Sequence, residues 1–195
     1  MNVQNNALSN LVFERLKYEI FQDNVSWNFV ANTAYQEAQT ADPIRDFSWE
    51  LTTFKSGKAI HELFHITELA VRLALDNSNQ TLSKIHRIRI GLITATNAPH
   101  VHGPHVDYQF PHTTGLIYLN DSDGDTIFYN EIYDPTCKLN SEKYYTDKLK
   151  SIVTVKETFT PKENTFVWFN GLQYHSSTSP ITTQKRLVIN FNYEN

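Results

Sequence analysis

The sequence predicts an α+β fold that is mainly β, with helices first and a jelly roll or barrel of strands after them. In the N-terminal third, apolar residues recur at helical spacing. From residue 84 onward, short β-prone runs alternate with turn residues. A chain of 195 residues can bury one core of this kind, with the helices packed on one sheet. We therefore expect a single domain over residues 1–195, in which residues 1–83 support a jelly-roll core formed by residues 84–195.

Two amphipathic helices are predicted in the N-terminal third. The first spans roughly residues 6–22, where apolar side chains recur every three or four positions. The second spans about Lys58–Asp76, because it follows Ser56-Gly57 and is stopped by Asn77-Ser78-Asn79. Two aromatic-rich runs between the helices, Trp27–Val30 and Phe47–Phe54, predict strands.

The second half of the chain predicts short strands separated by tight turns. Asp123-Gly124 and Asn170-Gly171 supply the turn chemistry. Residues 131–150 are polar and are expected to form a long loop, a candidate lid over a site. The expected strands are Ile85–Thr96, Thr113–Asn120, Thr126–Tyr129, Ser151–Phe159, Asn164–Phe169 and Arg186–Asn192.

The composition narrows the cellular setting and the partners. A single cysteine, Cys137, excludes an internal disulfide framework and a thiolate-rich metal site, and favours a reducing, cytoplasmic location. Seventeen basic residues against 21 acidic ones give a net charge of −4, so a nucleic-acid partner is not expected. A membrane span and a signal peptide are not expected either. The histidines are the unusual feature, because four of the eight lie between His100 and His112.

Two histidine motifs compete as metal sites, and the first is His61-Glu62-Leu63-Phe64-His65. It matches the H-E-x-x-H pattern of zinc proteases, in which two histidines one helical turn apart bind zinc and the glutamate acts as base. Both histidines fall on the polar stripe of the predicted helix, whereas a zinc helix should face a cleft. The favoured interpretation is a pair of surface histidines, with a zinc metallopeptidase as the alternative.

The second motif is His105-Val106-Asp107. Residues two apart in an extended segment face the same side, so His105 and Asp107 can bind one ion. His175 lies just past the Asn170-Gly171 turn, where a neighbouring strand can present a third ligand. Two imidazoles and one carboxylate on one face of a metal form the triad that binds ferrous iron in oxygenases.

The expected last strand supports this second motif. One face of Arg186–Asn192 is apolar, and the other carries Arg186, Asn190 and Asn192. Polar side chains that point into a barrel are costly unless they bind a partner. Since arginine grips a carboxylate with two parallel hydrogen bonds, we expect Arg186 to bind one end of a small dicarboxylate whose other end lies near His175.

These motifs follow one another in a fixed order. They are His105–Asp107, Gly115–Asn120, Asp121–Phe128, Phe166–Gly171, His175 and Arg186–Asn190. In residues and order they resemble the iron- and 2-oxoglutarate-dependent dioxygenases, and are most similar to the prolyl-hydroxylase-like branch, particularly the short forms common in marine phages and marine bacteria. The resemblance covers about residues 84–193 and is only general over residues 1–60.

The resemblance implies a double-stranded β-helix, that is, two sheets in a jelly roll with helices supporting the larger one. It implies that Fe(II) is bound by His105, Asp107 and His175. It further implies that Arg186 pairs with the distal carboxylate of 2-oxoglutarate and that Tyr118 hydrogen-bonds the same carboxylate. The implied reaction consumes O2, converts 2-oxoglutarate to succinate and CO2, and hydroxylates an unactivated C–H bond.

Several questions stay open at the level of sequence. Family analogy favours a peptidyl proline as substrate, with other peptide or small-molecule substrates as alternatives, and the oligomeric state is not defined. Thr94 or Thr96 is a candidate to hold the metal-proximal end of 2-oxoglutarate. His100, His102 and His112 are interpreted as solvated loop histidines, with a role in shaping the mouth of the substrate site as the alternative. The main alternative function is a metal-binding jelly roll without oxygenase activity.

Overall fold

The computed structural model describes residues 1–33, 46–134, 136 and 152–195. Its two helices are α1 (Asn10–Ile20) and α2 (Phe64–Asn77). The strands of the larger sheet are β1 (Asn2–Asn5), β2 (Asn28–Val30), β3 (Ser48–Lys55), β4 (Lys58–Ala59), β5 (Lys84–Thr94), β6 (Thr113–Tyr118), β9 (Thr165–Asn170) and β11 (Lys185–Glu194). The strands of the smaller sheet are β7 (Thr126–Ile132), β8 (Val155–Phe159) and β10 (Gln173–Ser177).

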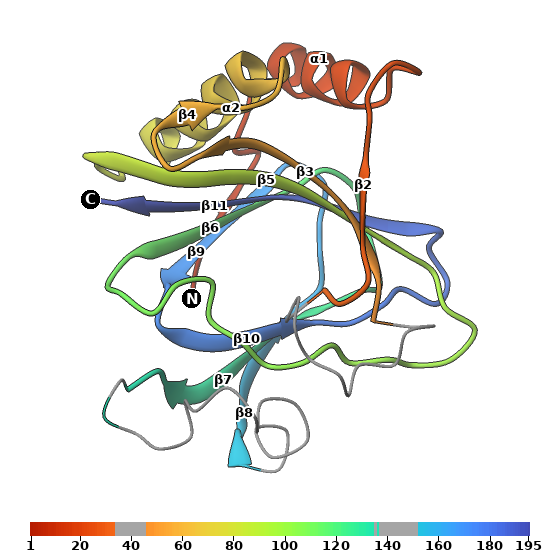
Figure 1. Cartoon of the computed structure of the whole chain (residues 1–195), viewed down its shortest axis with the longest axis vertical. Helices are drawn as coiled ribbons and strands as arrows, with labels where there is room; N and C mark the ends of the chain where they lie inside the picture. The colour runs from red at the N-terminus through yellow and green to blue at the C-terminus, as the bar shows by residue number, and fades with distance from the viewer. Residues whose placement is uncertain (34–45, 135, 137–151) are drawn as a thin grey trace.

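The two sheets face each other, and both helices lie on the outer side of the larger sheet (Figure 1). The strand order of the larger sheet is β1-β9-β6-β11-β5-β3-β2, with β4 paired to β3. The smaller sheet has the order β10-β7-β8. The pairs between described strands are antiparallel, so the α+β, mainly β class predicted from the sequence is confirmed.

Two apolar layers lie on the two faces of the larger sheet. Leu16 of α1 and Val71 of α2 share a buried cluster with Ile88 of β5 and Ile189 of β11. Between the sheets, Val188 belongs to a second buried cluster. Successive residues of β11 therefore alternate between the helix layer and the space between the sheets, as the sequence pattern predicts.

The second helix begins at Phe64 rather than near Lys58, so its predicted start was wrong. Ser56 and Gly57 both have positive φ angles, 53° and 79°, which suit the two central residues of a tight hairpin turn. This turn joins β3 to β4 instead of starting a helix. The stop signal is confirmed, because α2 ends at Asn77 and Asn79 follows with a φ of 55°.

Besides β4, two strands were absent from the predicted set, β1 and β10. Residues 2–5 form β1 at the edge of the larger sheet, next to β9, and the first helix is accordingly shorter than expected. β10 has the sequence Gln-Tyr-His-Ser-Ser and is buried throughout. The strand was not predicted because both of its faces carry polar residues, so its sequence lacks the alternation of apolar and polar residues. It nevertheless carries one of the expected metal ligands, His175.

The boundary expected at residue 83 does not separate a supporting part from the jelly roll, because strands on both sides of it share one sheet. Strands β1, β2 and β3, which precede it, pair into the same sheet as β5, β6 and β11. The first two residues of the loop expected at 131–150 belong to β7, and most of that loop lies outside the described residues, as does Cys137. Neither described helix has the length and apolarity needed to cross a membrane.

Gly115→Ala tests the close packing of β6 on β11. Gly115 pairs with Phe191, and a methyl group at Gly115 would overlap the ring of this fully buried side chain. We expect the free energy of unfolding, measured by urea denaturation, to fall by about 1–3 kcal/mol because the ring must move.

The matched control is Gly91→Ala in β5, which also neighbours β11. There the nearest atom to the added methyl group is Cγ1 of Val188 at 3.8 Å, an ordinary contact. The change in unfolding free energy should stay within about 0.5 kcal/mol. Equal losses in the two variants would contradict the proposed overlap.

Candidate metal centre

The structure brings His105, Asp107 and His175 together. Each side chain offers one ligand atom, and these atoms lie within 4.8 Å of one another. The backbone holds the two histidines opposite each other in an antiparallel bridge, because the amide nitrogen of each donates to the carbonyl oxygen of the other, at 2.9 and 3.0 Å. Their ring centroids are 4.6 Å apart. The predicted convergence of these three residues is therefore present in the fold.

Hydrogen bonds fix the orientation of both imidazoles. Nδ1 of His105 lies 3.0 Å from the carbonyl oxygen of Gly103, and Nδ1 of His175 lies 3.1 Å from that of Gln173. A carbonyl oxygen only accepts, so Nδ1 carries the hydrogen and Nε2 keeps its lone pair. Burial lowers the pKa of both histidines, and with the nearby His105 it lowers the pKa of His175 to about 3. Both rings are thus neutral, which is the form that binds metals.

The carboxylate of Asp107 is almost fully buried and accepts four hydrogen bonds. Nη2 of Arg87 donates to Oδ1 at 2.6 Å, and the side chain of Asp107 is only 3% exposed. Oδ2 accepts from the amides of Asn192 at 2.9 Å and Asn190 at 3.2 Å, and from the hydroxyl of Thr114 at 3.4 Å. Burial alone would raise the pKa of Asp107, but the charge of Arg87 holds it well below its usual range.

His112 extends this network instead of facing solvent. Its Nε2 lies 3.2 Å from the hydroxyl of Thr114, and its Nδ1 donates to the carbonyl of Phe110 at 2.7 Å. The ring lies directly over Gly171, where any Cβ would overlap it. His112 is 8% exposed, so its interpretation as a solvated loop histidine was wrong. The same correction applies to His100 and His102, whose side chains are 11% and 1% exposed.

A narrow cavity extends from the histidine pair to Arg186. Its wall includes His105, His175, Thr126 and Arg186. Arg186 is 5% exposed, and its Nη2 donates to the hydroxyl of Thr126 at 2.7 Å. Its Nε has no hydrogen-bond partner, and among the described residues no carboxylate lies within ion-pair distance of Arg186. The cavity thus ends at a buried cation that has no ion-paired carboxylate among the described residues.

Tyr118 is placed beside Arg186 but one step back from the cavity. Its hydroxyl hydrogen-bonds the same Thr126 oxygen at 2.7 Å, and the guanidinium of Arg186 lies 5.5 Å from the centre of its ring. Thr126, which belongs to the cavity wall, therefore stands between the hydroxyl of Tyr118 and the cavity. The sequence interpretation missed Thr126, whose only signal was its position at the start of a strand.

The turn before β11 holds Arg186 in place. The carboxylate of Asp123 accepts hydrogen bonds from the backbone amides of residues 181–183 and from the hydroxyls of Thr182 and Thr183, at 2.5–3.1 Å. These bonds outweigh the effect of burial and lower the pKa of Asp123 well below its usual range. A Cβ at Gly124 would crowd Cδ of Arg186 at 3.1 Å. The Asp123-Gly124 pair thus serves to position the arginine strand.

Strand β5 supplies polar residues that the sequence interpretation missed. Arg87 pairs with Asp107, and Arg89 donates from Nη1 to Oε1 of Glu50 at 2.7 Å, with Arg89 and Glu50 both in the cavity wall. The sequence did contain a pattern that predicts this arrangement. Residues 87–90 read Arg-Ile-Arg-Ile, so polar and apolar residues alternate in β5 as they do in β11.

Thr94 and Thr96 do not reach the cavity. Thr94 pairs with Lys185, whereas Ile93 pairs with Arg186, so Thr94 projects from the opposite face of the sheet. The hydroxyl of Thr96 donates to the carbonyl of Ala98 at 2.8 Å. The candidates for holding the metal-proximal end of 2-oxoglutarate were therefore wrong. Arg89 is the cationic residue of β5 that lines the cavity.

The H-E-x-x-H motif does not form the geometry of a zinc protease. His61 and Glu62 precede α2, and Nδ1 of His61 accepts a hydrogen bond from the amide of Leu63 at 3.1 Å. His65 is exposed on the helix. Within the described ranges, neither histidine belongs to a group of three metal-ligating side chains.

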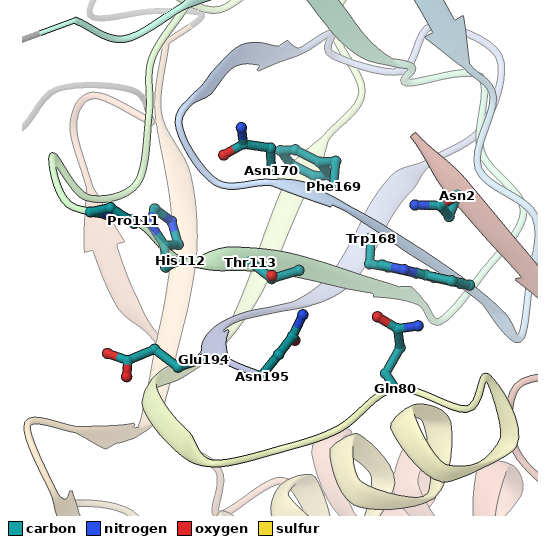
Figure 2. Close-up of a pocket in the computed structure, with 10 residues that line it drawn as sticks. All are labelled: Asn2, Gln80, Pro111, His112, Thr113, Trp168, Phe169, Asn170, Glu194 and Asn195. Carbon is teal, nitrogen blue, oxygen red and sulfur yellow. The ribbon is translucent and has the colours of Figure 1, made fainter.

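A wider pocket lies at the other end of β6, β9 and β11, away from Arg186 (Figure 2). Its wall combines Trp168 with amide side chains, His112 and Glu194. His105, Asp107, His175 and Arg186 are not part of it. The narrow cavity, and not this open pocket, is therefore the candidate site.

Comparison with solved structures finds similar folds over nearly the whole chain. No family model and no curated protein matches the sequence. A member of the 2OG-Fe(II) oxygenase family from Burkholderia pseudomallei aligns over 97% of this chain and 82% of its own, with a TM-score of 0.60 and 12% identity. The fold is that of the 2-oxoglutarate- and Fe(II)-dependent oxygenases. The predicted double-stranded β-helix is confirmed.

Two further solved structures show the same similarity. A prolyl hydroxylase from Trichoplax adhaerens, in complex with a peptide of the hypoxia inducible factor oxygen degradation domain, has a TM-score of 0.56 and 13% identity, over 98% of this chain and 82% of its own. HygX from Streptomyces hygroscopicus, with nickel, 2-oxoglutarate and hygromycin B bound, has a TM-score of 0.60 and 14% identity, over 98% and 81%.

Asp107→Ala tests the buried ion pair of this oxygenase fold in metal-free protein. Removing the carboxylate leaves the buried charge of Arg87 without its carboxylate partner and takes away one acceptor of the amides of Asn190 and Asn192. With EDTA present, the free energy of unfolding at pH 7 should therefore fall by about 3–5 kcal/mol in urea denaturation. Glu68→Ala is the control, because its partner Arg72 is 57% exposed and the loss should stay below about 1 kcal/mol.

The same experiment has a defined pH dependence. The folded-state pKa of Asp107 lies below the unfolded value of about 3.9, so its stabilisation is fully present above that pH. It is lost only as the pH falls through the lowered folded-state pKa. The difference between wild type and Asp107→Ala should therefore be constant from pH 5 to 7 and narrow in stronger acid. A constant difference throughout would contradict a charged Asp107.

Proposed function

We propose that this protein is an Fe(II)- and 2-oxoglutarate-dependent dioxygenase that hydroxylates an unactivated C–H bond and releases succinate and CO2. One observation supports this most directly. A buried arginine without a carboxylate partner in the described structure and two neutral histidines of a His-His-Asp group line the same narrow cavity. That combination suits an anionic co-substrate bound between a metal and a guanidinium.

Fe(II) fits the donors of the triad. His105 and His175 would bind through Nε2, and Asp107 through a carboxylate oxygen. Two imidazoles and one carboxylate leave three coordination positions for co-substrate and O2. When bound, the metal and 2-oxoglutarate supply the activation of O2. Arg87 and the asparagines of β11 fix the direction of the carboxylate, as outer hydrogen bonds commonly do for metal ligands.

2-Oxoglutarate fits the far end of the cavity. The guanidinium of Arg186 would pair with the distal carboxylate, and the hydroxyl of Thr126 lies 2.7 Å from the same guanidinium, within reach of that group. Tyr118 contributes as a positioning residue, since its hydroxyl holds Thr126. This differs from the direct contact implied by the resemblance. An anion bound here would also neutralise the buried charge of Arg186.

A peptidyl proline is the substrate we propose to test first. Prolyl hydroxylases are among the structures that share the fold, including one with a bound peptide. Others in that group include an epimerase from nogalamycin biosynthesis and HygX with bound hygromycin B, so small molecules form the second class to test. Arg89 and Glu50 line the cavity and are available to contact a substrate.

Turnover without substrate tests the proposed activity. Protein supplied with Fe(II), ascorbate and O2 should slowly convert 2-oxoglutarate to succinate, as measured by NMR. His105→Ala should abolish the conversion because a ligand is lost, whereas His65→Ala, which changes an exposed histidine, should leave it unchanged. Absence of succinate at every iron loading would rule the proposal out.

Co-substrate binding distinguishes the oxygenase from a metal-binding jelly roll without activity. In protein loaded with Ni2+, which binds without turnover, Arg186→Met should raise the Kd for 2-oxoglutarate by at least about 30-fold, because one partner of a buried charge pair is removed. Arg15→Met is the control, since Arg15 is 62% exposed. Calorimetry measures both. An unchanged Kd in Arg186→Met would favour the inactive jelly roll.

A further inference from the structure

A second group of two histidines and one carboxylate lies outside the triad. Asp46, His100 and His102 each offer one ligand atom, and these atoms lie within 4.8 Å of one another. Asp46 precedes β3 by two residues. The two histidines stand two apart in an extended segment. Its backbone is hydrogen-bonded to the end of β10 and the residues after it, through His102 N to Ser177 O at 2.9 Å and Ser179 N to His100 O at 3.0 Å. Extended geometry places both rings on the same side.

The three side chains are buried and share one oxygen atom. His102 is 1% exposed, His100 11% and Asp46 12%. Nε2 of His100 lies 2.5 Å from Oδ1 of Asp46, and Nδ1 of His102 lies 3.5 Å from the same oxygen. Two imidazole nitrogens therefore converge on a single carboxylate oxygen.

A single proton shared with Asp46 does not give both histidines a hydrogen bond. A proton can join His100 to Asp46, but Nδ1 of the fully buried His102 makes no well-formed hydrogen bond, because Oδ1 of Asp46 lies 3.5 Å away. Its other nitrogen, Nε2, is already engaged, 3.2 Å from the hydroxyl of Ser179. A buried polar atom without a partner costs about 1–3 kcal/mol. Burial also lowers the pKa of His102, so the ring is neutral and has a lone pair to offer.

We propose that Asp46, His100 and His102 form a second divalent-metal site, and that Zn2+ is the ion it fits best. Zn2+ takes nitrogen and carboxylate ligands in tetrahedral geometry, with ligand atoms about 3.3 Å apart. The two distances to Oδ1 of Asp46, 2.5 and 3.5 Å, lie on either side of that value. Two imidazoles make Ca2+ and Mg2+ poor occupants, because both prefer oxygen ligands. Water would complete the tetrahedron.

The ion would join two parts of the chain that support the triad. It would tie Asp46, two residues before β3, to the segment that contains His100 and His102, three residues ahead of His105. Ser179 would orient His102 in the way that outer hydrogen bonds orient metal-bound histidines. The site is a structural clamp in this proposal, and it does not depend on the proposed oxygenase activity.

Zinc titration of the metal-free full chain tests the proposal. Because Zn2+ also suits the triad, calorimetry should give two equivalents for wild type. Asp46→Asn and His175→Ala should each give one, and the double variant none. His65→Ala, an exposed-histidine control, should keep two. Zn2+ should raise the Tm of His175→Ala but not that of the double variant. If Asp46→Asn does not fold, His100→Gln takes its place.

The outcomes separate this proposal from the proposed function. One equivalent in wild type that survives in Asp46→Asn and disappears in His175→Ala would overturn the second site and leave the oxygenase proposal intact. One equivalent that disappears in Asp46→Asn and survives in His175→Ala would support the second site and overturn the iron site. Two equivalents in Asp46→Asn would also overturn the proposal, because the carboxylate would then not be a ligand.

Discussion

The ion pair between Arg87 and Asp107 is the interaction on which the arrangement of the site depends. Asp107 lies in a segment without regular secondary structure, yet its carboxylate must stay charged although its side chain is 3% exposed. Arg87 of β5 supplies the opposite charge, and Asn190 and Asn192 of β11 supply two amides. Two adjacent strands of the larger sheet thus hold the loop that carries the carboxylate, and that loop also carries His105.

This dependence explains why β11 has two unlike faces. Its apolar residues anchor the sheet to the helices, and its polar residues serve the cavity at one end and Asp107 at the other. A substitution that shifts the backbone of β11 through its apolar face would also shift the polar side chains on its other face. Packing of the helix layer and geometry of the site are therefore coupled through a single strand.

Much of the fold and the triad could be predicted from the sequence because they rest on local regularities. Alternation in Arg186–Asn192 gives the orientation of the arginine, and the spacing of His105 and Asp107 gives their shared side. The start of α2 could not be predicted in the same way, since Ser56-Gly57 is compatible with either a hairpin or a helix boundary and tertiary pairing decides. The burial of His100, His102 and His112 depends on residues distant in sequence, and no local pattern reports it.

The position of β11 in the larger sheet also constrains the order in which the protein can fold. β11 lies between β5 and β6, and every other described strand precedes it in the chain. The strands already present therefore flank a gap until β11 inserts, and the apolar faces of α1 and α2 lack part of their partner surface. Most contacts of the sheet are non-local, so folding should be slow for a chain of this size. A chain in which β11 has not yet paired would expose the edges of β5 and β6, and unpaired strand edges of this kind are prone to aggregation.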